Sequence, residues 1–249
     1  MDRDSYAPGT PSWVDLGSPD VDASVAFYSA LLGWEVDEAD PAAGGYRIAR
    51  LGGRMVAGLG PQQGPVSAWT TYFATDDAEA HAAAIAAHGG TVLMGPMDVM
   101  DQGRMVIATD PEGAAFGLWQ AGAHRGAQVV GETGAVGWNE LWTRNVEGAK
   151  AFYSAVLGLV PDDDAMAGYT IWKVDGQMVG GAMTIPPDMP PQVPAHWAVY
   201  FVVDSADAAT ARVAELGGSV VAPPFDVEGV GRIAMLHGPA SESFGVFSP

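Results

Sequence analysis

Cysteine is absent from the 249 residues, which excludes disulfide bonds, thiolate metal ligands and a cysteine nucleophile. Basic residues are scarce, since 11 Lys and Arg stand against 30 Asp and Glu, and the formal net charge is −19. That charge would repel nucleic acid phosphates and anionic membrane surfaces, so we expect neither as a partner. The sequence has no apolar run of membrane-spanning length and no N-terminal secretion signal, so we expect a soluble, cytoplasmic protein.

The most informative feature that is present is an internal repeat. Residues 13–34, WVDLGSPDVDASVAFYSALLGW, return at 137–159 as GWNELWTRNVEGAKAFYSAVLGL. Trp13 matches Trp138 and Phe27 matches Phe152 at one constant spacing, which indicates an aligned repeat rather than shared composition. We therefore predict a lead-in over 1–9, a first domain over 10–121, a glycine-containing linker over 122–134 and a second domain over 135–249.

The pattern in the first half predicts two modules of one strand, one helix and three strands. In the first module, a strand over 13–17 precedes a helix that begins after Asp20 or Asp22 and ends at Gly33. Two strands joined by a Gly-Gly turn then follow. The second module has an alanine-rich helix over about 77–88. The expected strands after the first helix lie at 46–51, 54–59, 69–75, near 92, 105–109 and 116–120.

The second half follows the same order, with one principal insertion. The segment MTIPPDMPPQVPAH, residues 183–196, contains five prolines and is longer than its counterpart in the first half. Long loops of this kind often cover a functional site, so we consider it a candidate lid.

These motifs are similar to those of a known family. The FYxxxLGW and FYxxxLGL segments, the strand before each, and the DPEG turn at 110–113 resemble the vicinal oxygen chelate superfamily, which includes glyoxalase I, extradiol dioxygenases and bleomycin or fosfomycin resistance proteins. The resemblance covers both halves. It implies an α+β fold of two tandem domains, with four βαβββ modules that form curved mixed sheets around cup-shaped cavities. The chain would then be a monomer in which its two domains pair with each other, or a homodimer.

The resemblance also implies where a metal would bind. Members that use a metal place His, Gln or Glu at four strand positions that point into the cup. These positions fall on Trp13, Gly58, Thr70 and Gly117 in the first half and on Trp138, Gly181, Ala198 and Gly245 in the second. Only Thr70 offers even a marginal donor, so we predict no metal and no other cofactor. The alternative is a displaced metal site that uses His196, His237, Asp15 or Glu140.

Strand parity indicates what the cups contain instead. Asp15 and Glu140 lie two residues beyond the tryptophans and should face the same side. We expect aromatic walls, one carboxylate in each cup, and glycines that leave room for a flat, partly aromatic small molecule. The predicted wall residues are Trp13, Tyr72 and Trp119 in the first cup and Trp138, Trp142, Tyr200 and Phe247 in the second.

The polar candidates have both functional and structural interpretations. Glu140 and Asp15 could act as general bases assisted by Tyr200 and Tyr72, or they could simply accept structural hydrogen bonds. Arg104 and Arg232, which repeat with a preceding glycine, could pair with those carboxylates, hold an anionic group of the ligand, or be structural. His196 and His237 break the repeat and therefore point to the second half as the working site.

Other residues have a purely structural interpretation. We expect the two Phe-Tyr pairs to serve helix packing. We expect His81, His88 and His124 to be solvated.

Two classes of function follow from these cups. The favoured hypothesis is a metal-independent enzyme of the isomerase, cyclase or lyase type, which acts on a small carbonyl metabolite by acid–base chemistry. The alternative is a non-catalytic protein that sequesters a small molecule, as antibiotic-resistance proteins of this fold do. Metal-dependent glyoxalase or dioxygenase activity is a third hypothesis, which the residues at the ligand positions disfavour.

Overall fold

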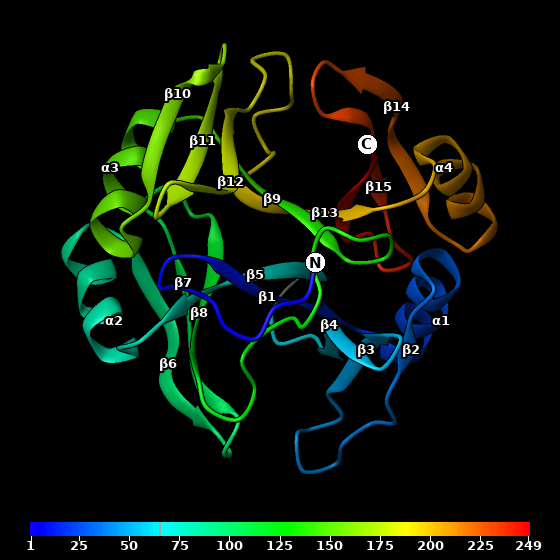
Figure 1. Ribbon diagram of the computed structural model, residues 1–249, viewed down its shortest axis with the longest axis horizontal. Helices are drawn as coiled ribbons and strands as arrows, with labels where there is room; N and C mark the ends of the chain where they lie inside the picture. The colour runs from blue at the N-terminus through cyan, green and yellow to red at the C-terminus, as the bar shows by residue number, and fades with distance from the viewer. Residues whose placement is uncertain (65) are drawn as a thin grey trace.

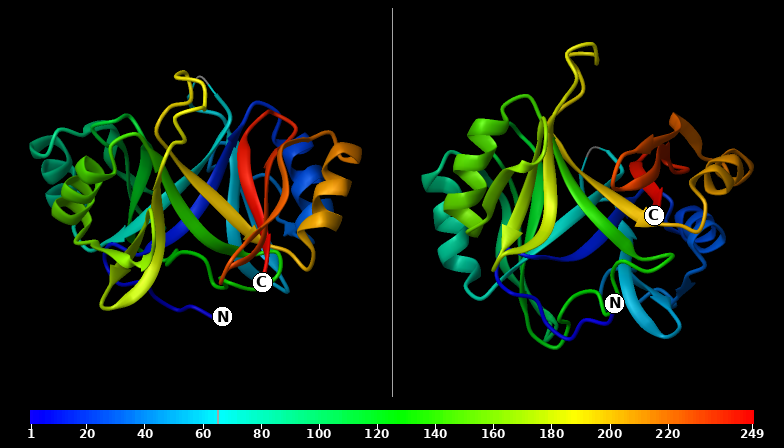
Figure 2. Two further views of the ribbon diagram at one scale, coloured as in Figure 1. Left: turned by 90° about the horizontal axis from the view of Figure 1, so that it is seen from above. Right: turned by 45° about the horizontal axis from the view of Figure 1, so that its top comes forward.

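The chain forms two equivalent α+β domains in the computed structural model, which describes residues 1–64 and 66–249. Each domain has one eight-stranded mixed sheet, with strand order β2-β3-β4-β1-β5-β8-β7-β6 in the first and β10-β11-β12-β9-β13-β16-β15-β14 in the second. Figures 1 and 2 show how the sheets curve between the flanking helices. The predicted fold class and the duplication are confirmed.

The elements follow the predicted order in both domains. The first domain contains β1 (Pro11–Ser18), α1 (Val21–Leu32), β2 (Glu35–Val36), β3 (Arg47–Leu51), β4 (Arg54–Pro61), β5 (Ala68–Thr75), α2 (Ala78–Ala87), β6 (Thr91–Val99), β7 (Gly103–Thr109) and β8 (Ala115–Ala121). The second contains β9 (Val136–Thr143), α3 (Val146–Leu157), β10 (Val160–Met166), β11 (Tyr169–Val174), β12 (Gln177–Thr184), β13 (His196–Val202), α4 (Ala206–Glu215), β14 (Ser219–Val227), β15 (Gly231–His237) and β16 (Ser243–Ser248).

The boundaries of α1 follow from local chemistry. The Asp20 side chain accepts a hydrogen bond from the Ala23 backbone N–H at 3.0 Å, which satisfies one of the free donors at the helix start. Gly33 ends the helix with φ of 76°, a left-handed conformation that glycine adopts without steric cost. Of the two predicted candidates, Asp20 is thus the residue that caps the helix.

The side chains of strand β1 point alternately to the core face and to the cup face of the first sheet. Val14 and Leu16 are buried in the hydrophobic core, whereas Trp13 and Asp15 point to the opposite side. The strand lies in the middle of the sheet, parallel to β4 and antiparallel to β5. This central position brings Asp15 next to residues from both modules of the domain.

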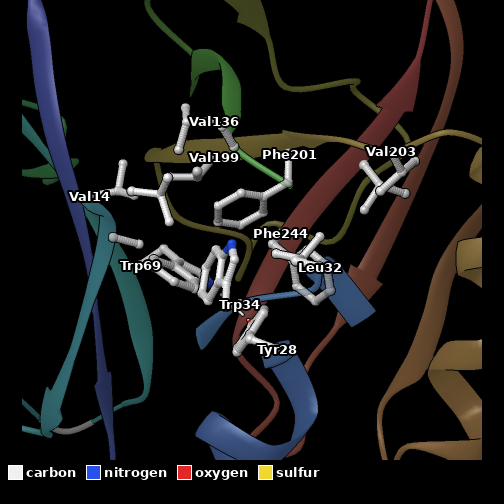
Figure 3. Close-up of a cluster of buried hydrophobic side chains, with 14 of the residues drawn as sticks. Val14, Tyr28, Leu32, Trp34, Trp69, Val136, Val199, Phe201, Val203 and Phe244 are labelled. Atoms are coloured by element: carbon white, nitrogen blue, oxygen red, sulfur yellow. Dashed lines mark hydrogen bonds between the residues drawn. The ribbon is translucent and has the colours of Figure 1, made fainter. Parts of the chain in front are cut away.

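The two sheets pack back to back, so the core of the protein is also the interface between its domains. One cluster joins Val14 and Phe27 of the first domain to Val199, Phe201 and Phe244 of the second, and Figure 3 shows part of it. A second cluster joins helices α2 and α3 with the strands beneath them. Figure 1 shows α2 beside α3 on one flank and α1 beside α4 on the other. Each domain therefore depends on the other to bury its apolar face.

The repeated tyrosine of each Phe-Tyr pair forms a polar bridge across this interface. The Trp69 indole N–H donates to the Tyr28 hydroxyl, and Tyr28 donates to Glu242 of the other domain, both at 2.9 Å. Tyr153 makes the equivalent bond to Asp110 at 3.1 Å. Burial raises the pKa of both Asp110 and Glu242. The pairs do serve packing, as predicted, and their hydroxyls also tie the domains together.

The N-terminal residues are held against the linker rather than loose. Asp2 forms a β-bridge with Val129, and Tyr6 donates a hydrogen bond to the Ala127 carbonyl at 2.6 Å. The proline-containing loop between β12 and β13 lies at the opposite end of the molecule, where it projects beyond the strand ends in Figure 2. None of the helices among the described residues is long and apolar enough to cross a membrane.

We expect Tyr28→Phe to lower the free energy of unfolding by about 1–3 kcal/mol, because the change leaves the Trp69 N–H and the Glu242 carboxyl buried without this partner. Chemical denaturation followed by circular dichroism measures the loss. Ser29→Ala, at a neighbouring position on the same helix, is the control and should stay within about 0.5 kcal/mol of the wild type. Equal stability of the Tyr28→Phe variant and the wild type would contradict a stabilising role for the bridge.

Candidate active site in the two cups

The cup face of the first domain, here called the first cup, holds a carboxylate between two tyrosines. The Asp15 Oδ2 atom accepts hydrogen bonds from Tyr72 at 3.0 Å and from Tyr46 at 3.3 Å. The Trp13 indole N–H donates to the Tyr46 hydroxyl at 2.9 Å. The other oxygen, Oδ1, makes no hydrogen bond to any residue that the structure describes. One side of the carboxylate is therefore held in place while the other is left open.

The second cup repeats this arrangement around Glu140. Tyr169 donates to Oε1, and Tyr200 donates to Oε2, both at 2.6 Å. The Trp138 indole N–H donates to Tyr169 at 2.8 Å, as Trp13 does to Tyr46. A third donor, the Trp142 indole N–H, reaches Oε2 at 2.6 Å and has no counterpart in the first cup, where Gly17 stands at that position. Glu140 is only 8% exposed and has a donor on each oxygen.

The glycines at the former ligand positions accommodate these tyrosines. A Cβ atom at Gly58 would overlap the Tyr46 hydroxyl, and one at Gly117 would overlap the Tyr72 ring. In the second cup the corresponding overlaps are Gly181 with Tyr169 and Gly245 with Tyr200. We expected the glycines to leave room for a ligand. That expectation was wrong, because tyrosine rings of the protein occupy the space.

Burial among aromatic rings changes the acidity of the first cup. Desolvation raises the pKa of Asp15 from 3.8 to about 7, although the hydrogen bonds from Tyr72 and Tyr46 oppose the shift. The pKa values of Tyr46 and Tyr72 rise well above 10, first through burial and then through the negative charge of Asp15. The first cup thus combines a carboxyl group that titrates near neutral pH with two hydroxyls that keep their protons.

A histidine of the linker distinguishes the first cup from the second. His124 lies edge-on to Trp13, with ring centroids 4.4 Å apart, and to Trp119, at 5.5 Å. Both of its ring nitrogens are enclosed without a hydrogen-bond partner among the residues that the structure describes, and burial lowers its pKa to about 4. The expectation that His124 is solvated was therefore wrong. No pattern in the sequence predicts this position, since the linker does not repeat.

A histidine also contributes to the second cup, but as part of a stack. His196 lies over Trp142, with ring centroids 5.9 Å apart and planes 24° apart. Its Nδ1 atom is 2.9 Å from the Pro194 carbonyl. The proline-containing loop thus ends directly beside Trp142.

The remaining predicted residues lie farther from the carboxylates. Trp119 is buried in the first cup and donates to the His124 carbonyl, and Phe247 lies over Gly137 at the equivalent place in the second. His237 is separated from Glu140 by two intervening strands, β13 and β16. Arg104 pairs with Glu79 and Asp98, and Arg232 pairs with Asp207 and Asp226. Neither arginine forms an ion pair with a cup carboxylate among the described residues, so the predicted pairing with Asp15 or Glu140 is wrong.

Tyr46 and Tyr169, which donate to the two cup carboxylates, are the residues that could not be predicted from strand parity. They match each other in the repeat, but each stands just outside or at the edge of a strand, where parity does not fix the side chain's direction. The glycines on the neighbouring strand could have identified them. Tyr169 pairs with Met183 of β12, which lies two residues from Gly181.

The comparison with protein families agrees with this geometry. The family model described as Glyoxalase/Bleomycin resistance protein/Dioxygenase superfamily matches residues 10–118 and again residues 130–246, once in each domain. The chain belongs to this superfamily. The resemblance drawn from the sequence motifs is confirmed.

Similar superfamily proteins span nearly the whole chain. A Mycobacterium bovis protein named "Putative glyoxylase CFP32" is 44% identical over 258 residues, covering 99% of this chain and 97% of its own. The "Anthracycline biosynthesis protein DnrV" of Streptomyces peucetius is 43% identical over 260 residues, covering 97% of this chain and 94% of its own. The Mn(II)-bound glyoxalase of Novosphingobium aromaticivorans has a TM-score of 0.67 at 16% identity, covering 97% of this chain and 82% of that one, and shows the shared fold.

The residues at the superfamily's metal positions do not fit a divalent ion. Trp13 uses its only polar atom to hold Tyr46, and tyrosine rings cover Gly58 and Gly117. Across the part of the chain that the structure describes, no group of three or more His, Cys, Asp or Glu side chains could hold a metal. A divalent ion needs several converging donors, which these cups lack.

We expect Gly58→Ala to displace Tyr46 from Asp15, because the added methyl group and the Tyr46 hydroxyl cannot occupy the same space. Overpacking of this kind costs about 1–3 kcal/mol of unfolding free energy, and near-ultraviolet circular dichroism should report the displaced ring. Gly64→Ala is the matched control, since a Cβ atom there meets none of the described atoms within 4 Å. An unchanged spectrum and stability for Gly58→Ala would refute the packing of Tyr46 on Gly58.

Proposed function

We propose that this protein is a metal-independent enzyme that moves a proton on a small, partly aromatic carbonyl compound bound in the first cup. The observation that carries the proposal is the geometry of Asp15, whose Oδ2 atom is held by Tyr72 and Tyr46 while its Oδ1 atom makes no hydrogen bond to a described residue. Burial raises the pKa of Asp15 to about 7, which suits proton transfer at neutral pH. Of the two predicted candidate bases, we therefore favour Asp15. Glu140 already has three donors on its two oxygens and is the better candidate for a structural or ligand-orienting group.

The geometry suggests how the first cup would work. Asp15 takes a proton from the carbon next to the carbonyl group, using the open Oδ1 atom. The neutral carboxyl group then attracts the hydroxyls of Tyr46 and Tyr72 less strongly. One of these hydroxyls is free to turn toward the substrate oxygen, where negative charge develops. Return of the proton to a different carbon would complete an isomerisation, and loss of a leaving group would complete a lyase reaction.

The relatives support a role in small-molecule metabolism. One is named as a glyoxylase and another for anthracycline biosynthesis. The aromatic side chains of the first cup, Trp13, Tyr72 and Trp119, form one cluster and favour a ligand that has a flat apolar part.

A second candidate function is binding without turnover, and the second cup favours it. The stacked Trp142 and His196 form a flat surface beside Glu140. A ligand ring could extend this stack while the carboxylate stays saturated by protein donors. In that case the protein would sequester its ligand, as resistance proteins of this superfamily do.

We expect the wild-type protein to speed the exchange of solvent deuterium into the acidic carbon of 2-tetralone and related bicyclic ketones, measured by proton NMR. Asp15→Asn should slow the protein-dependent exchange by about 100-fold or more, because it removes the base. The rate should rise with pH and level off above about 7, since only the ionised carboxylate accepts the proton.

Glu140→Gln is the matched control and should leave this exchange nearly unchanged, and so should dialysis against a chelator. Loss of activity on chelation would contradict metal independence. Equal exchange rates for Asp15→Asn and the wild type would rule out Asp15 as the base. Saturable binding of the ketones with no exchange above the solvent rate would favour the sequestering function.

A further inference from the structure

A cavity of about 130 Å³ lies between the two domains, apart from the carboxylates of both cups. Its walls come from β1 and β9, from the linker, and from the N-terminal segment, which runs across the junction of the two sheets in Figure 1. Most of the lining is apolar or aromatic and includes both Trp13 and Trp138. An apolar cavity of this size is comparable to one that holds a benzene ring.

One buried polar residue in the wall breaks the symmetry of the interface. Asn139 accepts a hydrogen bond from Thr71 at 2.8 Å and is only 5% exposed. In the repeat, Val14 and Val199 stand at the corresponding positions, and Figure 3 shows them close together in the apolar cluster. The polar pair of Thr71 and Asn139 therefore occurs at one of two equivalent positions. The apolar pair at the other position shows that packing alone does not require polar side chains there.

The amide of Asn139 has an unused group. Thr71 occupies its oxygen, but its nitrogen makes no hydrogen bond within the part of the chain that the structure describes. That nitrogen is not completely enclosed either, and the open space that Asn139 lines is the cavity. A ligand acceptor in the cavity would take the hydrogen bond that this nitrogen does not make to any described residue.

An arginine lies at the rim of the same cavity. Arg3 lines it and forms no ion pair with a described residue. The neighbouring Asp2 does not neutralise it, because Asp2 pairs with Arg54. The guanidinium group of Arg3 is therefore available to a ligand, and its planar set of donors matches the geometry of a bound carboxylate.

We propose that this inter-domain cavity binds a small aromatic monocarboxylate of about the size of benzoate. The ring lies in the apolar part of the cavity, the carboxylate lies at the rim against Arg3, and Asn139 donates a hydrogen bond to it. The ligand contacts Trp13 and Trp138, whose indole N–H groups hold Tyr46 and Tyr169 in the two cups. The site is therefore suited to an effector that acts on both cups at once.

Isothermal titration calorimetry with sodium benzoate tests the proposal on the full chain. We expect one saturable site per chain, with affinity reduced about tenfold or more by Arg3→Gln, which removes a charge-assisted hydrogen bond. Arg125→Gln, at an exposed linker arginine outside the cavity lining, is the matched control and should bind like the wild type. Benzyl alcohol, which has no charge, should bind equally to the wild type and to Arg3→Gln.

A double variant tests the polar wall. Thr71→Val with Asn139→Val recreates the Val14 and Val199 pair of the other half and should also weaken benzoate binding. If this variant does not fold, Arg3→Gln decides alone, since Arg3 is exposed and not part of the core. Absence of saturable benzoate binding to the wild type, or equal affinity for wild type and Arg3→Gln, would overturn the proposal. Neither outcome depends on catalysis in the first cup.

Discussion

Close packing of tyrosine rings on glycines is the constraint on which both cups depend. Tyr46 can reach Asp15 only because residue 58 has no side chain, and Tyr169 reaches Glu140 only because residue 181 has none. The resemblance to metal-using members of the superfamily places their ligands at the same glycines. The small residues that admit the tyrosine rings offer no side-chain donor to a metal ion.

Duplication explains why this chemistry can differ between the two cups. The back-to-back packing of the sheets holds the two domains in one arrangement, since both hydrophobic clusters are shared between them. Substitutions on the cup faces do not alter this packing. The first cup carries the shorter Asp15 and encloses His124 from the linker, whereas the second carries Glu140 with an additional donor, Trp142. These differences support a catalytic first cup and a ligand-orienting second cup.

Much of this architecture could be predicted from the sequence because it rests on local and periodic signals. The repeat indicated two domains, and Gly33 marked the end of α1, whereas its start was narrowed to Asp20 or Asp22. Strand parity placed Asp15 and Tyr72 on one face. Tyr46 and His124 could not be assigned in this way. Tyr46 precedes its strand, and His124 lies in a linker without periodicity, so only the folded backbone determines where their side chains point.

The acidity of Asp15 is the quantity that the proposed function requires. Carbon-13 NMR of the side-chain carboxyl groups, with Asp15→Asn to assign the signal, measures its pKa directly. Burial among aromatic residues predicts a midpoint near 7, with the carboxyl protonated below that pH and ionised above it. A midpoint near the ordinary value of 3.8 would contradict the account, because such a carboxylate would be too weak a base for the chemistry proposed.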